Sequence, residues 1–232
     1  MYEELVAFPV REIKKLQASG ILNGGILIDF STGPAIFHLL PLSEEFSDIT
    51  VLDTNESSIQ ELERWKNKHE EAYDWSHLPE LFPELKGDSK KWLAKEDVLR
   101  SKIKRIMMCD ISKENPTAPV VLEKADCLLT MYLLQPISQD KDAYCRNLKN
   151  VSSLLKVGGH LLLVGKFNAI FFSVKDKEFH ILNYDEAFLR QALTDAGFTI
   201  QGFQVLKSKV RRDDVNFGNV HFLNAIKVRD VL

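Results

Sequence analysis

The sequence predicts an α/β fold in which a mostly parallel sheet carries helices on both faces. Short apolar runs that suit buried parallel strands alternate along the chain with longer segments whose apolar residues recur at helical spacing. Two strand-like segments follow near the end of the chain and break this alternation. With 45% hydrophobic residues, the 232-residue chain can bury a sizeable core, so we expect a single domain over 1–232.

The first quarter of the chain predicts a helix followed by two strand–helix pairs. Residues 5–16 carry apolar side chains at helical spacing, although Pro9 interrupts the pattern. Two short apolar runs, 26–28 and 48–53, suit buried strands. The segments that follow these runs, and that we expect to be helical, are 35–42 and 56–69.

An irregular stretch separates these pairs from the rest of the sheet. Residues 71–90 contain two prolines and a glycine and exceed an ordinary βα connection, so we expect an insertion at about 70–92. The pair Gly158-Gly159 is expected to cap the end of a strong helix over 140–155. The other expected elements are a helix at 91–104, strands at 103–109, 125–131 and 161–164, a helix at 184–195, and a final strand pair at 198–206 and 220–228.

Composition excludes several classes of protein. Thirty Lys and Arg against 33 Asp and Glu give a net charge of −3, which excludes polyanion binding driven by bulk charge. No stretch approaches the roughly 20 apolar residues of a membrane helix. The three cysteines show neither a disulfide framework nor metal-ligand spacing. We therefore expect a cytoplasmic protein that binds no nucleic acid, membrane or metal. We also expect a monomer, although composition alone does not give the oligomeric state.

The residues that follow each predicted strand are where a ligand is expected, because such sheets bind ligands beyond the carboxyl ends of their strands. Asp29 ends the first strand and leads into the small-residue turn Ser31-Thr32-Gly33. Small side chains there let a ligand approach backbone N–H groups. With Gly33 as its only glycine, the turn lacks the G-x-G-x-x-G pattern of dinucleotide-binding proteins. An ordinary βα turn remains the alternative.

A second acidic residue, Asp53, ends the second strand 24 positions after Asp29. A carboxylate at this spacing can accept hydrogen bonds from both hydroxyls of a ribose. The alternative is that Asp53 caps the next helix, a role for which Thr54, Asn55 and Ser57 compete.

The third and fourth strands add further polar and apolar candidates at the same edge of the sheet. Asp110 follows the third strand and can meet an adenine amino group or simply cap a turn. Thr130-Met131-Tyr132 follows the fourth strand, beside any ligand that the sheet holds. The joint occurrence of these positions is more informative than any one of them.

Several short motifs stand together in this order along the chain: Asp29-x-x-x-Gly33-Pro34, Asp53, Asp74-Trp75-Ser76, Cys109-Asp110-Ile111, Ala125-Asp126-Cys127, Asp142-Ala143-Tyr144-Cys145-Arg146 and Leu154-Leu155-Lys156-x-Gly158-Gly159. With them the chain resembles the class I S-adenosylmethionine-dependent methyltransferases. More narrowly, it resembles the N-methyltransferases for nicotinamide, indolethylamines and phenylethanolamines. The resemblance extends over nearly all of the chain.

This resemblance implies a Rossmann-like, seven-stranded sheet whose last strand is antiparallel. It also implies an enzyme that uses S-adenosylmethionine to methylate the nitrogen of a small amine or a pyridine-type acceptor. The residues expected at the cofactor are Asp29, Ser31, Thr32, Gly33, Phe37, Asp53, Thr54, Ser58, Asp110, Ile111, Thr130 and Met131. Because the family usually has Gly at Ser31 and Asn at Ser58, we expect weakened but not abolished cofactor binding.

The acceptor side departs further from the family. Where nicotinamide enzymes place two Asp residues, two Ser residues and a Tyr, this chain has Gln135, Gly165, Ile181, Ala169 and Phe172. These replacements predict a more apolar acceptor pocket and argue against nicotinamide as the substrate.

One acidic pair can still hold an amine. Asp213-Asp214 resembles the acidic pair near the C-terminus of the phenylethanolamine enzymes, and either residue is a candidate amine anchor. The alternative is a solvated loop, because Arg211-Arg212 adjoins the pair and can neutralise it.

The family also carries an N-terminal segment with several tyrosines that closes over cofactor and acceptor. Only Tyr2 lies near the start of this chain, so we expect that lid segment to be absent, either by truncation or in the natural protein. A site without its lid is wetter and less completely assembled. A non-catalytic or weakly active protein with the methyltransferase fold is therefore the alternative. An NAD-binding oxidoreductase is disfavoured by the missing glycines.

Overall fold

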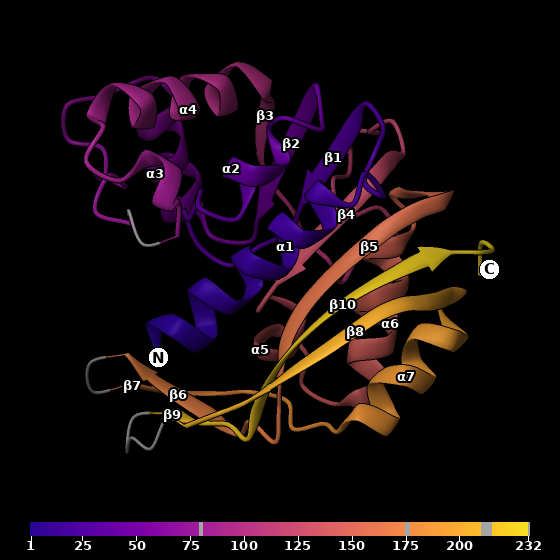
Figure 1. Ribbon diagram of the computed structural model, residues 1–232. Helices are drawn as coiled ribbons and strands as arrows, with labels where there is room; N and C mark the ends of the chain where they lie inside the picture. Colours follow the sequence, from indigo (N-terminus) through magenta and orange to yellow (C-terminus); the bar gives the residue numbers. More distant parts are fainter. Residues whose placement is uncertain (79–80, 175–176, 210–214, 232) are drawn as a thin grey trace.

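A seven-stranded sheet forms the centre of the protein, which is described here from a computed structural model over residues 1–78, 81–174, 177–209 and 215–231. The strand order is β3-β2-β1-β4-β5-β10-β8 (Figure 1), with bounds β1 Ile26–Asp29, β2 Asp48–Asp53, β3 Ile103–Met108, β4 Ala125–Met131, β5 Leu155–Phe167, β8 Phe198–Lys207 and β10 Asn219–Lys227. Strands β1 to β5 pair in parallel, whereas β10 runs antiparallel to both of its neighbours. The expected mostly parallel sheet with an antiparallel last strand is therefore confirmed.

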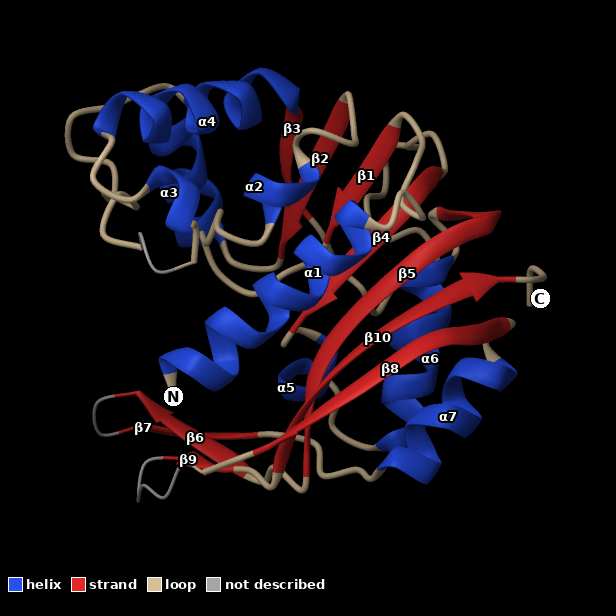
Figure 2. Ribbon diagram, in the orientation of Figure 1, coloured by secondary structure: helices blue, strands red, loops and turns tan. Residues whose placement is uncertain are grey.

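Helices cover both faces of this sheet, as Figure 2 shows. Their bounds are α1 Phe8–Ala18, α2 Leu39–Leu42, α3 Glu56–Lys66, α4 Ser89–Lys102, α5 Leu134–Ile137, α6 Lys141–Ser152 and α7 Glu186–Asp195. Successive strand residues enter opposite cores, because side chains alternate across a sheet. Leu27 packs into the core that α1 to α4 complete, and Ile28 into the core that α6 and α7 complete.

The chain begins with a π-helix, Glu3–Ala7, that runs directly into α1. Pro9 lies at the junction between this π-helix and α1, so the predicted interruption falls within one continuous helical segment. The buried Glu4 carboxylate accepts hydrogen bonds from Ser208 Oγ at 2.7 Å and from Lys209 N at 2.6 Å. The N-terminal helix is thereby fastened to the chain beyond β8.

The predicted helix over 35–42 is mostly wrong, since only α2, Leu39–Leu42, is helical there. The physical reason lies in the preceding residues. His38 is fully buried and its Nε2 lies 2.9 Å from Asp29 Oδ2, which fixes the backbone before α2 in a turn instead of a helix.

The prediction that Gly158-Gly159 caps a helix is also wrong. Helix α6 ends at Ser152, and both glycines lie inside β5. Gly158 has a φ of +86°, and the pairing of β5 with β4 shifts register between Ala125 and Cys127. A Cβ at Gly159 would come within 3.0 Å of the Asp126 carbonyl oxygen. The glycines therefore allow the strand to bulge against β4.

A second, three-stranded sheet in the order β7-β6-β9 was not predicted. Its strands are β6 Phe171–Val174, β7 Lys177–His180 and β9 Val215–Asn216. In Figure 1 it lies near the N-terminus. Phe172 stacks on Phe179 across β6 and β7 with ring centroids 5.1 Å apart. The predicted irregular insertion holds a short 3-10 turn, Pro83–Leu85, before α4.

The Glu4 contacts predict that Glu4→Gln loosens the N-terminal helix. The two hydrogen bonds go to different oxygens of the Glu4 carboxylate, so the variant removes the charge and replaces one acceptor oxygen by an NH2 group that cannot accept a bond; bonds to charged groups contribute about 1.5–3 kcal/mol each. We expect faster amide hydrogen exchange across residues 3–18. Glu3→Gln is the matched control, because Glu3 is exposed and pairs with Arg11 at the surface. Equal exchange in the two variants would contradict the assigned role of Glu4.

Candidate active site

Two buried carboxylates, at the ends of β1 and β2, hold the loop 30–38 between them. Asp29 Oδ1 accepts a hydrogen bond from Ser31 Oγ at 2.5 Å, and its Oδ2 lies 2.9 Å from His38 Nε2. Both oxygens of Asp29 are thus engaged within the protein, and the side chain is 1% exposed. Asp29 and Ser31 are both predicted at the cofactor. In the structure they hydrogen-bond to each other and help to fix the loop 30–38.

Asp53 holds the same loop from the other side. Its Oδ2 accepts a hydrogen bond from Gly33 N at 3.0 Å, and its Oδ1 accepts one from Asn55 N at 2.8 Å. The Ser58 side chain also hydrogen-bonds to this carboxylate. Burial raises the pKa of Asp53 in spite of these bonds. The proposed helix-cap role of Asp53 is wrong, because Asn55 caps α3 by accepting from Ser57 N.

Open space lies above the turn between these carboxylates. Gly33 has a φ of +81°, a backbone conformation that favours glycine, and a Cβ built there would meet no atom within 4 Å. Thr32 and Thr54 are exposed on either side, and Thr32 N donates to Met131 O at 3.1 Å. A ligand can therefore approach the Asp53 end of β2 over the glycine.

Asp110, after β3, has the turn-capping role that was one of its two predictions, and its contact with an adenine amino group stays a prediction. Asp110 is exposed, and its Oδ1 accepts hydrogen bonds from Ser112 N and Ser112 Oγ, which lower the pKa of Asp110. It therefore caps a turn, while Ile111 beside it is buried. Burial raises the pKa of the Cys109 thiol to about 12, which leaves that cysteine unreactive. At the end of β4, Thr130 is also buried, and its Oγ1 is oriented toward Phe30 O.

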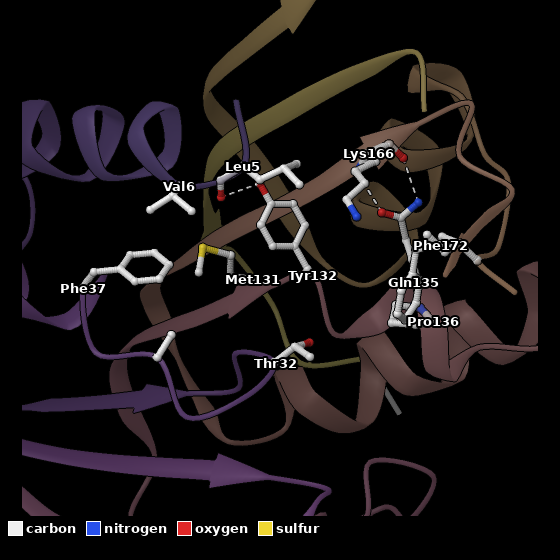
Figure 3. A pocket seen from close by; sticks show the side chains of 12 residues that line it. Leu5, Val6, Thr32, Phe37, Met131, Tyr132, Gln135, Pro136, Lys166 and Phe172 are labelled. Carbon is white, nitrogen blue, oxygen red and sulfur yellow. Dashed lines mark hydrogen bonds between the residues drawn. The ribbon is translucent and has the colours of Figure 1, made fainter. Parts of the chain in front are cut away.

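An apolar cavity of about 310 Å³ adjoins this strand-end region. Its lining residues are Leu5, Val6, Thr32, Ala35, Phe37, Met131, Tyr132, Gln135, Pro136, Lys166, Phe172 and Ile181. Thr32, Phe37 and Met131 belong both to this lining and to the residues predicted at the cofactor, so the two predicted regions are neighbours. Figure 3 shows Leu5 and Val6 entering the cavity from the N-terminal helix.

The N-terminal helix is fixed to the cavity wall by a tyrosine. Tyr132 has a φ of 59° and donates from its hydroxyl to Leu5 O at 3.1 Å (Figure 3). Burial raises the pKa of Tyr132, so its hydroxyl stays protonated and remains a donor.

Three of the five residues predicted for the acceptor pocket line this cavity, namely Gln135, Phe172 and Ile181. Ala169 is fully buried and stands outside the lining. Gly165 faces away, since a Cβ there would lie 2.7 Å from both Tyr184 Oη and His221 Nε2. Its placement in the pocket is therefore wrong: neighbouring strand residues point to opposite faces, and the next residue of β5 enters the cavity instead.

Gln135 lines the cavity, but its side-chain amide hydrogen-bonds to backbone groups. Its Nε2 donates to Lys166 O at 2.7 Å and to Leu182 O at 3.2 Å, and its Oε1 accepts from Lys166 N at 2.7 Å. The amide joins the end of β5 to the segment that follows β7, as the dashed lines of Figure 3 partly show. Gln135 thus fixes the wall and leaves no free amide group for a ligand.

Sequence reasoning missed Lys166. Its Nζ lies 5.1 Å from the ring centroid of Tyr132 and 5.6 Å from that of Phe217. Burial lowers the pKa of Lys166 to about 8. The sequence contains one signal for it: Lys166 is a charged residue that comes directly after the apolar run 161–164 and Gly165.

Other predictions concern the acidic pair, metals and membranes. Asp213 and Asp214 lie outside the described residues. Within 1–78, 81–174, 177–209 and 215–231, no three His, Cys, Asp or Glu side chains gather in a way that could hold a metal ion. None of the helices in those same ranges is long and apolar enough to span a bilayer.

The chain is similar to known proteins over most of its length. A sequence profile described as the NNMT/PNMT/TEMT family matches residues 1–228. An indolethylamine N-methyltransferase from Oryctolagus cuniculus is 37% identical, with 85% of this chain and 75% of that protein covered. A nicotinamide N-methyltransferase from Homo sapiens is 35% identical, with 80% and 70% covered.

Solved structures support the fold. A magnesium protoporphyrin IX methyltransferase from Synechocystis PCC 6803 with bound SAH superposes with a TM-score of 0.60 at 15% identity, covering 95% of this chain and 82% of the other. An S-adenosylmethionine-dependent methyltransferase from Clostridium acetobutylicum reaches 0.60 at 13% identity, with 97% and 95% covered. The match of the family profile to almost every residue, together with the identity to these curated relatives, places the chain in the NNMT/PNMT/TEMT family.

Proposed function

We propose that this protein is an S-adenosylmethionine-dependent N-methyltransferase for a small amine or azaheterocycle. The proposal rests on one observation: the loop that Gly33 N fastens to the Asp53 carboxylate adjoins an apolar cavity. Thr32, Phe37 and Met131 line this cavity and also belong to the residues predicted at the cofactor. Family members named as N-methyltransferases for indolethylamine and nicotinamide favour a catalytic protein over a non-catalytic one.

The residues at the strand ends fit such a cofactor. The Asp53 carboxylate offers acceptor oxygens for ribose hydroxyls beside the open space at Gly33, and Thr54 lies exposed next to it. Ile111 and Met131 supply apolar surface. Because Gly33 N already donates to Asp53 Oδ2, ribose hydroxyls share the carboxylate with this bond or replace it.

The chemistry needs little from the protein beyond position and a dry site. When bound, S-adenosylmethionine supplies a methyl group that a nitrogen lone pair displaces from sulfur, and the electron pair of the carbon–sulfur bond returns to sulfur. A pyridine-type nitrogen needs no base, whereas a protonated amine must first lose its proton. The apolar wall of Phe37, Met131 and Tyr132 excludes water and orients the acceptor, and such positioning can contribute about 7–11 kcal/mol.

We further propose that one chain makes up the working unit and acts in the cytoplasm. Leu5 and Val6 of the same chain complete the cavity wall, so no second copy is needed to form it. The three cysteines are free thiols, which suits a reducing compartment. The proposal of a single domain over 1–232 rests on the two cores that share one sheet.

Titration calorimetry with S-adenosylhomocysteine, the product form of the cofactor, tests this proposal. We expect micromolar binding by the unaltered chain and at least a tenfold loss of affinity in Asp53→Ala, about 1.4 kcal/mol, because the ribose loses its carboxylate. Asp48→Asn at the opposite end of β2 is the matched control and should bind normally. Unchanged affinity in a folded Asp53→Ala protein would remove Asp53 from the cofactor site.

The lining also predicts the shape of the acceptor. With apolar walls and no free amide on Gln135, a neutral bicyclic azaheterocycle such as quinoline should be methylated with a lower KM than nicotinamide. Initial rates of methyl transfer from labelled S-adenosylmethionine to the two compounds would measure this. Equal or better turnover of nicotinamide would show that the apolar wall does not set the preference.

A further inference from the structure

We propose that Lys166 makes this site select acceptors that carry a carboxylate, with a pyridine-type ring nitrogen as the methylated atom. The inference deepens the proposed N-methyltransferase function and rests on it. It concerns the charge of the acceptor, which the apolar lining alone leaves open.

Lys166 brings a charge into a cavity whose other walls are apolar or neutral. Of the described residues that line the cavity, Lys166 alone is ionisable as a cation or an anion at neutral pH. The close-up in Figure 3 shows its side chain between Tyr132 and Gln135, with the amine pointing into the cavity. The backbone of Lys166 is fixed on both sides by the Gln135 amide, so the side chain starts from a rigid position.

The ammonium group has no acidic partner in the described parts of the chain. No hydrogen bond or ion pair of its Nζ joins it to residues in 1–78, 81–174, 177–209 or 215–231. Its contacts are with the faces of Tyr132 and Phe217, and cation–π contacts contribute about 0.5–2 kcal/mol. Burial lowers its pKa to about 8, so the charged form still predominates at neutral pH. A desolvated cation of this kind gains most from an anionic ligand.

The buried carboxylates of the N-terminal helix and of the end of β1 have hydrogen-bond partners within the protein. Glu4, whose charge acts on Tyr132, is turned toward Ser208 and Lys209 and accepts a hydrogen bond from each. Asp29 is enclosed by Ser31 and His38.

A protonated amine therefore finds a cation and no free carboxylate among the described lining residues. The positive sulfur of the cofactor adds a second charge of the same sign. Both charges favour an acceptor that brings its own negative charge.

The size and walls of the cavity suit an aromatic carboxylate. A cavity of about 310 Å³ lies at the small end of the usual range for ligand sites, which fits one or two fused rings. The faces of Phe37, Tyr132 and Phe172 can hold such a ring. A neutral ring nitrogen that accepts the methyl group releases no proton, so such an acceptor needs no general base.

Nicotinate and nicotinamide form a matched pair of probes, because they share ring and size and differ in charge. We would titrate each into the protein by calorimetry, with and without saturating S-adenosylhomocysteine, and measure methylation rates in parallel. We expect nicotinate to bind at least tenfold more tightly than nicotinamide. Lys166→Met should lose most of that preference, with nicotinamide affinity changed less than twofold.

Two further variants make the result specific. Lys166→Gln is a second neutral replacement in case the methionine variant folds poorly, and it should behave in the same way. Lys104→Met removes an exposed lysine on β3 and should leave both affinities unchanged. Loss of the nicotinate preference in Lys104→Met would mean that general charge attracts the probe, and would overturn the inference.

The remaining outcomes separate the inference from the proposed function. If S-adenosylhomocysteine binds but nicotinate shows no preference, or keeps it in Lys166→Met and Lys166→Gln, the inference is wrong and the methyltransferase proposal stands. If S-adenosylhomocysteine fails to bind while nicotinate still depends on Lys166, the proposed function falls and the anion site remains. Tighter binding of tryptamine than of nicotinate would also overturn the inference.

Discussion

The geometry of the strand ends depends on two carboxylates that hold one loop from opposite sides. Asp29 binds Ser31 and His38 beneath the loop, and Asp53 binds Gly33 N from beside it. Both carboxylates are almost completely buried, so leaving either without partners would cost several kcal/mol. The path that the loop takes gives both carboxylates hydrogen-bond partners. That path places Thr32 and Phe37 at the boundary between the Asp53 region and the cavity.

The cavity wall depends on the same requirement. A buried polar group must have hydrogen-bond partners, and these partners hold the wall together. Gln135 gives its whole amide to backbone groups around Lys166 and Leu182, and Tyr132 gives its hydroxyl to Leu5 O. Each bond joins segments that are distant in sequence. Polar side chains thus provide the scaffold of this pocket, while its inner surface stays apolar. Lys166 is the exception, because its buried ammonium group contacts aromatic rings and has no ion-pair partner in the described parts of the chain; this is why it is a candidate functional residue.

Much of the central sheet could be predicted because its signals are local. The strands that end at Asp53 and Met131 were predicted with the bounds that the structure has, since continuous apolar runs mark buried parallel strands. The failures came from contacts between distant segments. The Gly158-Gly159 pair resembles a helix cap in sequence, and only the pairing of β5 with β4 reveals the bulge.

In the candidate site, too, residues with local signals could be proposed from the sequence, whereas residues that depend on strand pairing could not. Asp53 could be proposed from the sequence because its spacing from the first strand is a local signal. Gly165 was misplaced and Lys166 overlooked for one reason: which of two neighbouring strand residues faces the cavity depends on the pleat, and the pleat is set by pairing with β4 and β10. The small sheet β7-β6-β9 escaped prediction because its strands are short and join residues that lie far apart in the chain.

The hydrogen bonds between Glu4 and the chain beyond β8 bear on the order in which the protein folds during its synthesis. Its two ends are separated by 204 positions for Ser208 and 205 for Lys209. The ribosome releases the helix that contains Glu4 before it releases Ser208 and Lys209, the partners that hold this helix in place. Contacts of such high sequence separation form late, because closing long loops carries an entropic cost. The cavity that Leu5 and Val6 line is therefore completed only after residue 209 has been synthesised.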